Sequence, residues 1–224
     1  MEFSITLVII IITVLVSLGG FSNHKIINDL IFYPPAITEQ KQWYRFFTCG
    51  LIHADVGHLL WNMLSLYLFG KYVEENFMVD GATGQALFGQ NGKIIYLVMY
   101  VAALFVCLLP TFAKHKNDYY YRSLGASGAV SAVIFAGLLL EPRNRVGLFI
   151  IPPVIPGYVF GPLYLIITSY LGRQSRDNVN HSAHFWGAVF GTAFVVVLAY
   201  ILKTEYHPLE QFIFKVKTDL GMSN

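Results

Sequence analysis

Charged side chains are scarce in this sequence. Only 12% of its 224 residues are Asp, Glu, Lys or Arg, whereas soluble domains carry about 25%. So few charges cannot cover the surface of a water-soluble fold, and 55% of the residues are hydrophobic. The composition therefore excludes an ordinary soluble domain and indicates a membrane protein whose outer surface faces lipid.

Cysteine and clustered positive charge are also lacking. The two cysteines, Cys49 and Cys107, have neither metal-ligand spacing nor the number needed for a disulfide framework, so we expect buried thiols. The net charge is only +2, and Lys and Arg are spread along the chain, which argues against a nucleic-acid partner. The same even spread leaves the orientation in the membrane undetermined.

Long apolar stretches dominate what is present. A membrane-spanning helix needs about 20 largely apolar residues, and such helices satisfy their own backbone hydrogen bonds in lipid. We predict an all-α membrane protein, a six-transmembrane-helix bundle forming one domain over residues 1–224. We expect it in a plasma membrane and its first segment to be a retained helix rather than a cleaved leader. The predicted helices span about residues 3–24, 56–75, 94–113, 126–141, 146–172 and 182–203.

The fifth segment and the loops carry additional information. The fifth segment contains four prolines, Pro152, Pro153, Pro156 and Pro162, each of which lacks a backbone donor. It is either a kinked helix after an extended entry or a loosely packed helix that acts as a lateral gate. The first loop, 25–55, is rich in aromatic residues and is predicted to lie partly at the membrane interface. The glycine-rich stretch 80–92 predicts a flexible connection, and the tail after Lys203 a short amphipathic helix.

Three polar clusters stand near the beginnings of the second, fourth and sixth segments. They are His53-Ala54-Asp55-Val56-Gly57-His58-Leu59-Leu60-Trp61-Asn62, Gly125-Ala126-Ser127-Gly128-Ala129 and Asn180-His181-Ser182-Ala183-His184-Phe185-Trp186-Gly187. Even-numbered segments run in the same direction, so the clusters lie on one side of the membrane at similar shallow depth. Polar groups inside a membrane are costly and commonly functional. The sequence therefore predicts a single site built from all three clusters.

The residue types in these clusters fit nucleophilic catalysis. Ser127 stands at a helix start, where backbone N–H groups and the helix dipole favour negative charge. His184 is a base that can take the serine proton near neutral pH. His58 and Asn62, four residues apart, share a helix face and can donate hydrogen bonds to an oxyanion. Small residues at spacing four, Gly187 and Gly191 in the sixth segment and Gly128 with Ala132 and Ala136 in the fourth, allow close helix packing.

Each cluster taken alone has a simpler explanation. Serine in a small-residue membrane helix is usually a packing residue, and a His or Asn pair can be an interhelical hydrogen bond. His181 competes with His184 as the base, and Ser131 competes with Ser127 as the nucleophile. The combination of complementary roles at matching depth favours Ser127 and His184.

The motifs resemble those of the rhomboid family of intramembrane serine proteases over essentially the whole chain. The match comprises His58 and Asn62, Gly125 and Ser127, and Ala183-His184 with Gly187 and Gly191. The resemblance implies a Ser127–His184 dyad without an acid and an oxyanion hole from the Ser127 N–H, His58 and Asn62. It also implies a supporting role for His53. It implies no metal and no cofactor.

Two positions depart from the family pattern. Ser131 stands where the family often has an aromatic residue that stacks on the catalytic histidine, and Tyr44 separates Trp43 from Arg45 in the first loop. Both leave the catalytic groups in place. We therefore expect an endopeptidase that cleaves transmembrane protein substrates in the lipid bilayer. The alternative is a catalytically silent rhomboid-like protein that binds client membrane helices.

Overall fold

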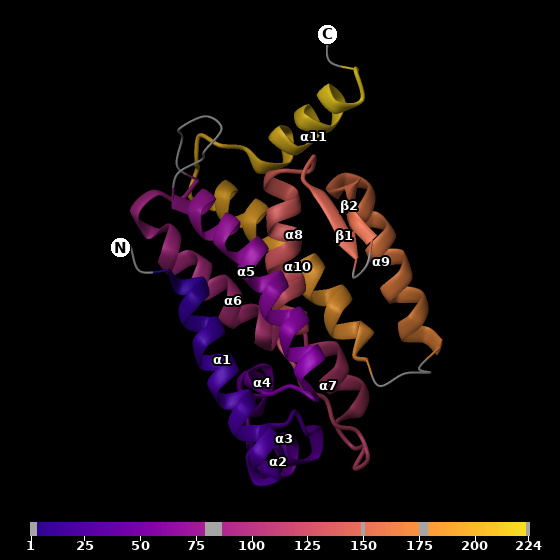
Figure 1. The fold of residues 1–224 in the computed structure, drawn as a ribbon. Helices are drawn as coiled ribbons and strands as arrows, with labels where there is room; N and C mark the ends of the chain where they lie inside the picture. The colour runs from indigo at the N-terminus through magenta and orange to yellow at the C-terminus, as the bar shows by residue number, and fades with distance from the viewer. Residues whose placement is uncertain (1–3, 79–86, 149–150, 175–178, 223–224) are drawn as a thin grey trace.

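The computed structural model describes residues 4–78, 87–148, 151–174 and 179–222, and it is built mainly of helices (Figure 1). The prediction of a helical bundle is confirmed. Within the described ranges, three helical segments are long and apolar enough to cross a membrane: Ile5–Ser22, Gly89–His115 and His181–Ile201. The longer helices are α1 (Ile5–Ser22), α5 (Val56–Met78), α6 (Gly92–Val106), α8 (Ser127–Leu140), α9 (Gly157–Gln174) and α10 (His181–Ile201).

Helix α8 lies at the centre of the bundle, with α5, α6, α9 and α10 around it. Except for Ser127 and Ile134, every residue of α8 is buried. A helix that is apolar on all sides is stable in a protein core or in lipid, and small residues along it let neighbouring helices pack closely around it. The sequence Ser-Gly-Ala-Val-Ser-Ala-Val-Ile-Phe-Ala-Gly-Leu-Leu-Leu therefore specifies a central helix, and its one partly exposed end carries Ser127.

Two glycines bring α10 against α8 at very short range. A Cβ added to Gly187 would lie 2.0 Å from the carbonyl oxygen of Gly128, and one added to Gly191 would lie 2.0 Å from that of Ala132. No larger side chain fits at either position without moving a backbone. The G-x-x-x-G pair thus faces the small residues of α8, as its spacing predicts.

The fifth and third predicted helices need correction. Residues from 146 onward do not begin a helix, because β1 (Arg145–Leu148) pairs antiparallel with β2 (Ile151–Pro156) and α9 begins only at Gly157. Prolines that would break a helix are tolerated in a two-stranded ribbon, in which each strand is an edge. The predicted helix 94–113 is interrupted at residues 107–108, between α6 and α7 (Leu109–His115).

The first loop is largely helical and partly buried. It contains α2 (His24–Leu30), α3 (Pro34–Gln40), α4 (Arg45–Thr48) and the 3₁₀ helix η1 (Cys49–Leu51). Phe32 and Phe46 are fully buried in contact with each other, and Phe46 also contacts Phe105 and Phe112. Only part of the aromatic set, including Trp43, Tyr44 and Phe47, remains exposed as an interfacial loop requires. These short helices lie at the lower end of Figure 1, beside the start of α8.

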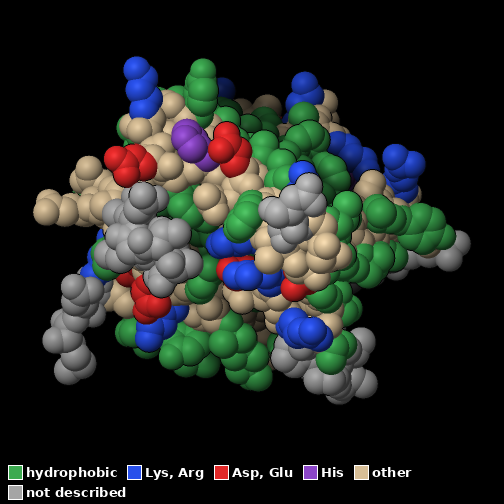
Figure 2. Space-filling view, turned by 90° about the horizontal axis from the view of Figure 1, so that it is seen from above, with side chains coloured by type: hydrophobic (Ala, Val, Ile, Leu, Met, Phe, Trp, Pro, Cys, Tyr) green, Lys and Arg blue, Asp and Glu red, His purple; other side chains and the backbone are tan. Residues whose placement is uncertain are grey.

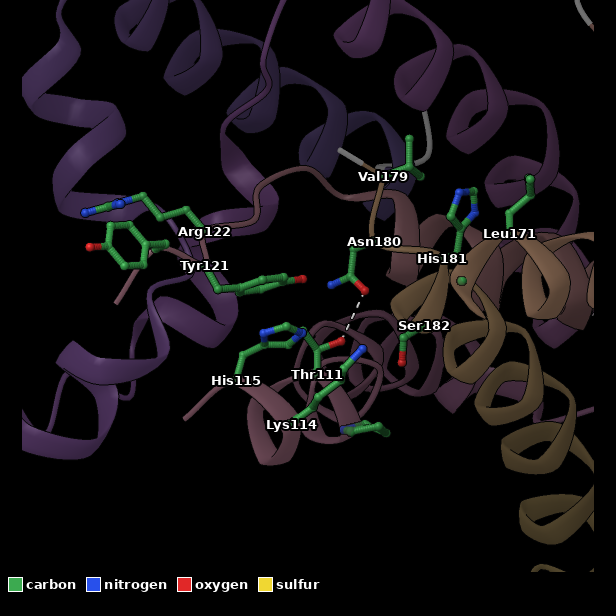
Figure 3. A pocket seen from close by; sticks show the side chains of 13 residues that line it. Thr111, Lys114, His115, Tyr121, Arg122, Leu171, Val179, Asn180, His181 and Ser182 are labelled. Atoms are coloured by element: carbon green, nitrogen blue, oxygen red, sulfur yellow. Dashed lines mark hydrogen bonds between the residues drawn. The ribbon is translucent and has the colours of Figure 1, made fainter. Parts of the chain in front are cut away.

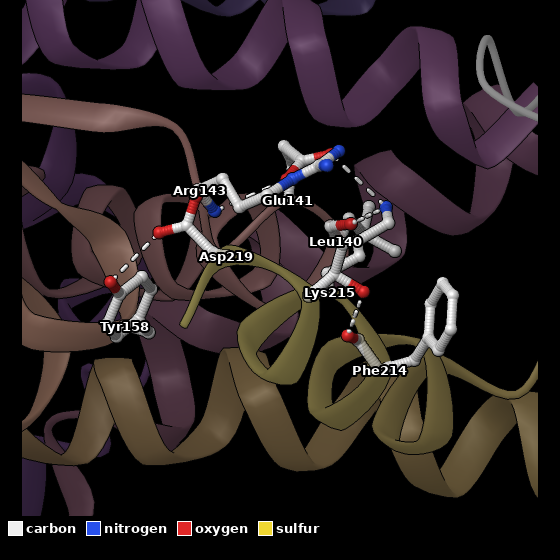
Figure 4. Close-up of polar contacts among 8 residues, drawn as sticks. Leu140, Glu141, Arg143, Tyr158, Phe214, Lys215 and Asp219 are labelled. Carbon is white, nitrogen blue, oxygen red and sulfur yellow. Dashed lines mark hydrogen bonds and ion pairs between the residues drawn. The ribbon is translucent and has the colours of Figure 1, made fainter. Parts of the chain in front are cut away.

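The opposite end carries the predicted amphipathic tail, α11 (Pro208–Asp219). Lys215 Nζ donates to the Leu140 carbonyl at 2.6 Å and lies 3.3 Å from the Glu141 carboxylate, while Tyr158 donates to Asp219 (Figure 4). Figure 2, seen from this end, shows basic and acidic side chains gathered near the centre of the face and around its rim. The predicted connection at 80–92 falls mostly outside the described residues; its last part forms η2 (Gly89–Asn91).

Glu74 fixes the beginning of α1 against α5. Its buried carboxylate accepts hydrogen bonds from the N–H groups of Ile5 (2.7 Å) and Thr6 (3.0 Å) and from the hydroxyls of Ser4 (2.9 Å) and Thr6 (2.8 Å). A carboxylate at a helix N-terminus also meets the positive end of the dipole. These hydrogen bonds satisfy the charged side chain of Glu74 where it is buried between the two helices.

We expect Glu74→Gln to lower the free energy of unfolding by about 1–3 kcal/mol, because the amide offers one acceptor oxygen in place of two. Thermal unfolding in detergent measures this change. Glu75→Gln is the matched control: Glu75 is exposed and 3.9 Å from Lys71, so its loss costs at most about 0.5 kcal/mol. Equal losses in the two variants would contradict the role of Glu74.

Candidate active site

The three polar clusters meet at one cavity of about 860 Å³. Its lining includes the predicted residues His58, Asn62, Gly125, Ser127, Gly128 and His184. They come from the start of α5, the turn into α8 and the first turn of α10, at the end of the bundle where these helices begin (Figure 1). The three polar clusters, which were predicted to lie on one side of the membrane because their helices run in the same direction, line the same cavity.

Ser127 and His184 are in direct contact. The Ser127 Oγ and the His184 Nε2 are 2.6 Å apart. Ser127 is the first residue of α8, and His184 stands in the first turn of α10, whose N-cap Asn180 accepts a hydrogen bond from the Ala183 N–H. The distance is that of a strong hydrogen bond, the geometry required for proton transfer from a serine hydroxyl.

The backbone just before Ser127 is fixed on three sides. Ser123 and Phe32 exchange backbone hydrogen bonds, and the Gly125 N–H donates to the Cys49 carbonyl at 2.9 Å. The Ala126 N–H donates to His53 Nε2 at 3.4 Å. The first loop thus holds the turn that presents the Ser127 hydroxyl.

His53 connects this turn to α1. Its Nδ1 lies 3.0 Å from the Ser17 Oγ, and the Ser17 hydroxyl donates to the Leu51 carbonyl. Since Nε2 accepts from Ala126, Nδ1 carries the hydrogen in this network, and the ring is neutral. Burial, with a smaller contribution from nearby His58, lowers the pKa of His53 to about 3. His53 therefore serves here as a neutral hydrogen-bonding bridge.

This lowered pKa makes the fold sensitive to acid. The unfolded chain binds a proton at His53 below about pH 6.5, whereas the folded chain does so only near pH 3. The free energy of unfolding therefore falls as pH falls through this window, by up to about 1.4 kcal/mol per unit. Thermal unfolding between pH 8 and 5 should show a steeper loss in the natural chain than in His53→Gln, which does not titrate; parallel slopes would exclude His53 as the source.

His58 and Asn62 line the cavity from α5. The side-chain amide nitrogen of Asn62 carries two hydrogens that can be donated. It donates one of them to the His58 carbonyl oxygen at 2.9 Å. The His58 ring lies so close to Gly125 that an added Cβ there would be 2.7 Å from His58 Cε1. Gly125 also has φ +110°, a conformation that only glycine adopts readily. Glycine at position 125 therefore permits both the positive φ of the turn and the close approach of the His58 ring.

The two competing residues lie beside the dyad. The Ser131 hydroxyl is 2.8 Å from the Tyr164 hydroxyl, so Ser131 joins α8 to α9. His181 is one turn before His184 and is buried. Sequence reasoning missed Tyr164 and Ser17. Ser17 had a detectable signal, because Thr6, Thr13 and Ser17 are the buried polar residues on one face of an apolar helix.

The chain is thus a helical bundle that brings a serine and a histidine together in a cavity at one end. The family model described as "Rhomboid domain" matches residues 40–201, and the chain belongs to the rhomboid family.

Named relatives agree with this assignment. RHOMBOID-like protein 12, mitochondrial, from Arabidopsis thaliana is 33% identical over 146 residues, which cover 63% of this chain and 42% of the relative. Rhomboid-like protein 11, chloroplastic, from the same plant is 31% identical over 173 residues, covering 70% and 53%. Rhomboid protease GluP of Bacillus subtilis (strain 168) is 25% identical over 179 residues, covering 77% and 29%. The chain thus spans about half or less of the length of these relatives. Their names include two organelles, so the relatives do not support the expected plasma membrane.

Proposed function

We propose that this chain is an intramembrane serine endopeptidase with Ser127 as nucleophile and His184 as general base. The observation that carries the proposal is the 2.6 Å contact between the Ser127 Oγ and the His184 Nε2 at the wall of a cavity large enough for a peptide segment. A serine hydroxyl is a weak nucleophile until a base removes its proton. The family includes relatives named as proteases, among them GluP.

The proposed mechanism follows from the residues around the dyad. His184 takes the Ser127 proton as the oxygen attacks a substrate carbonyl, and then gives that proton to the leaving amine. The Ser127 N–H, at the start of α8, and the side chains of His58 and Asn62 donate to the oxyanion. Water then hydrolyses the acyl-enzyme, with His184 again as the base. Gly128, Gly187 and Gly191 hold the two helices at the spacing that this transfer needs.

The proposed location is inside the bilayer, near one surface. We assign six spans to α1, α5, α6 with α7, α8, α9 and α10. Helix α8 has 14 residues and is about 21 Å long, whereas the hydrocarbon core of a membrane is about 30 Å thick. A central helix shorter than the core supports a nucleophile below the membrane surface, which a cavity connects to water. Transmembrane protein segments are the proposed substrates.

The experiment is cleavage of a transmembrane reporter by the purified protein in vesicles. We expect cleavage by the natural chain, loss of cleavage in Ser127→Ala, and retention of cleavage in Ser131→Ala. Each variant removes one serine hydroxyl, and the two serines lie about one turn apart on the same helix. Ser131→Ala therefore controls for an effect of the substitution on folding. Reporter binding without Ser127-dependent cleavage would refute the protease and favour a protein that binds client helices.

A further inference from the structure

A second cavity adjoins the active site. It has a volume of about 380 Å³ and lies between α7, the turn into α8 and the start of α10 (Figure 3). It shares Arg122, Val179 and Asn180 with the lining of the active-site cavity, so one peptide can reach both. We call it the Lys114 pocket; Thr111, Lys114, His115, Tyr121, Asn180 and Ser182 are the lining residues that define it.

Among the described residues that line it, the Lys114 pocket has two basic side chains, Lys114 and Arg122, and no acidic one. Lys114 is exposed, and in the view of Figure 3 its side chain points toward Thr111 and Ser182. Neither Asp nor Glu occurs among the lining residues that the structure describes, and within those parts of the chain Lys114 forms no ion pair. An ammonium group beside hydroxyl and amide groups is a binding site for an anionic group.

The walls of the pocket are fixed, which limits the entropy lost on binding. The His115 ring stacks on Tyr121 with centroids 3.8 Å apart, and its Nδ1 lies 3.0 Å from Asp118. The Asp118 carboxylate also accepts a hydrogen bond from the Tyr120 N–H. Asp118 itself is not one of the residues that line the Lys114 pocket. The Thr111 hydroxyl donates to the Asn180 Oδ1 at 3.1 Å.

Charge is distributed unevenly along the path that joins the two cavities. Asp55 lines the active-site cavity, where it accepts from the His58 N–H, whereas the other end of the path carries Lys114. The guanidinium of Arg122 lies 4.6 Å from the centre of the Tyr33 ring and adds positive potential at the boundary. A substrate lying across both cavities therefore meets one acidic and one basic end.

We propose that the Lys114 pocket receives an acidic side chain of the substrate, and so selects transmembrane substrates with Asp or Glu at a fixed distance from the cut. This inference rests on the proposed function. A partly exposed ion pair contributes up to about 1 kcal/mol, which corresponds to a preference of about five-fold for Glu over Lys at the position that reaches the pocket.

The test uses reporters that differ only in one residue, Glu, Gln or Lys, moved stepwise along the segment flanking the cut. At one position we expect kcat/KM to be about five-fold higher for Glu than for Lys, and the preference to shrink with added salt. Lys114→Glu should invert the order. Lys116→Glu is the matched control, because Lys116 is exposed, lies two residues away and is outside the lining; it should leave the order unchanged.

Binding separates this inference from the proposed function. The affinity of the Ser127→Ala protein for uncleaved reporters, measured by fluorescence energy transfer, should follow the same order. If the affinities follow that order but no Ser127-dependent cleavage occurs, the proposed protease function is refuted and the proposed role of the Lys114 pocket is retained. If Ser127-dependent cleavage and binding do not depend on the charge of the varied reporter residue, only the proposed role of the Lys114 pocket is refuted. A Glu preference seen in phosphatidylcholine vesicles but lost in phosphatidylglycerol vesicles would instead assign the pocket to lipid headgroups.

Discussion

His184→Gln is expected to lower kcat/KM for reporter cleavage by at least about 10²-fold, because a positioned base contributes about 10²–10⁴-fold. Glutamine is polar and similar in size, but it cannot take the proton that Nε2 accepts from the Ser127 hydroxyl 2.6 Å away. The measurement is the initial rate of cleavage at saturating and limiting reporter, which separates kcat from KM. The loss should fall on kcat, since His184 acts on the nucleophile rather than on substrate binding.

His181→Gln is the matched control for this prediction. His181 lies one turn earlier on the same helix and is buried, so its replacement disturbs packing without removing the base. We expect its kcat to stay within about ten-fold of that of the natural chain. A full loss in His181→Gln with retention in His184→Gln would transfer the role of base to His181.

Gly191→Ala is expected to have the largest effect on the fold. The added methyl group would lie 2.0 Å from the Ala132 carbonyl oxygen and 2.6 Å from its carbon, so α10 must move away from α8. Overpacking of this kind costs about 1–3 kcal/mol or more. The displacement also moves His184 from Ser127, and a shift of about 1 Å in a reacting group can cost about 10²-fold in rate. Thermal unfolding and reporter cleavage measured on the same sample should therefore both fall.

Gly161→Ala provides the comparison. A methyl group at Gly161 would meet nothing nearer than Phe135 Cε1 at 3.6 Å, which is ordinary contact. Alanine favours helix over glycine by about 1 kcal/mol, but Gly161 precedes Pro162, whose ring disfavours the helical conformation of a residue with a Cβ before it. Because the two effects oppose each other, this variant should stay within about 1 kcal/mol of the natural chain. If Gly191→Ala were equally harmless, the close contact of α10 with α8 would not be what holds the dyad together.

The sequence predicted which polar residues lie together better than it predicted the outlines of the fold. Ser127, His184, His58 and Asn62 were found because polar residues in apolar helices are few, and because parallel helices bring their beginnings to one side. The small-residue spacing of Gly187 and Gly191 predicted the α8–α10 contact in the same way. These inferences depend on local spacing and on the cost of polar groups in lipid, both of which a sequence displays.

The remaining features depend on tertiary contacts that spacing does not encode. The prolines of the fifth segment predicted an extended entry before its helix, which agrees with the strand β2 before α9. The predicted helix nevertheless began too early, at residue 146, because spacing does not encode the pairing of β1 with β2, where Val146 packs with Leu138 and Phe160. The bond between Ser131 and Tyr164 joins residues 33 positions apart on helices whose rotation the sequence does not fix. His53 was expected only to support the site; the bridge from Ser17 to Ala126 appears once the first loop is folded against α1.

The central claim is that His184 makes the Ser127 hydroxyl nucleophilic. Its most direct test is the reaction of the purified protein with a fluorophosphonate, followed by mass spectrometry of the labelled peptide. We expect one adduct, on Ser127, that forms in the natural chain and in Ser131→Ala and is lost in His184→Gln while the fold persists. An adduct on Ser131, or labelling of Ser127 at an unchanged rate without the imidazole, would contradict it.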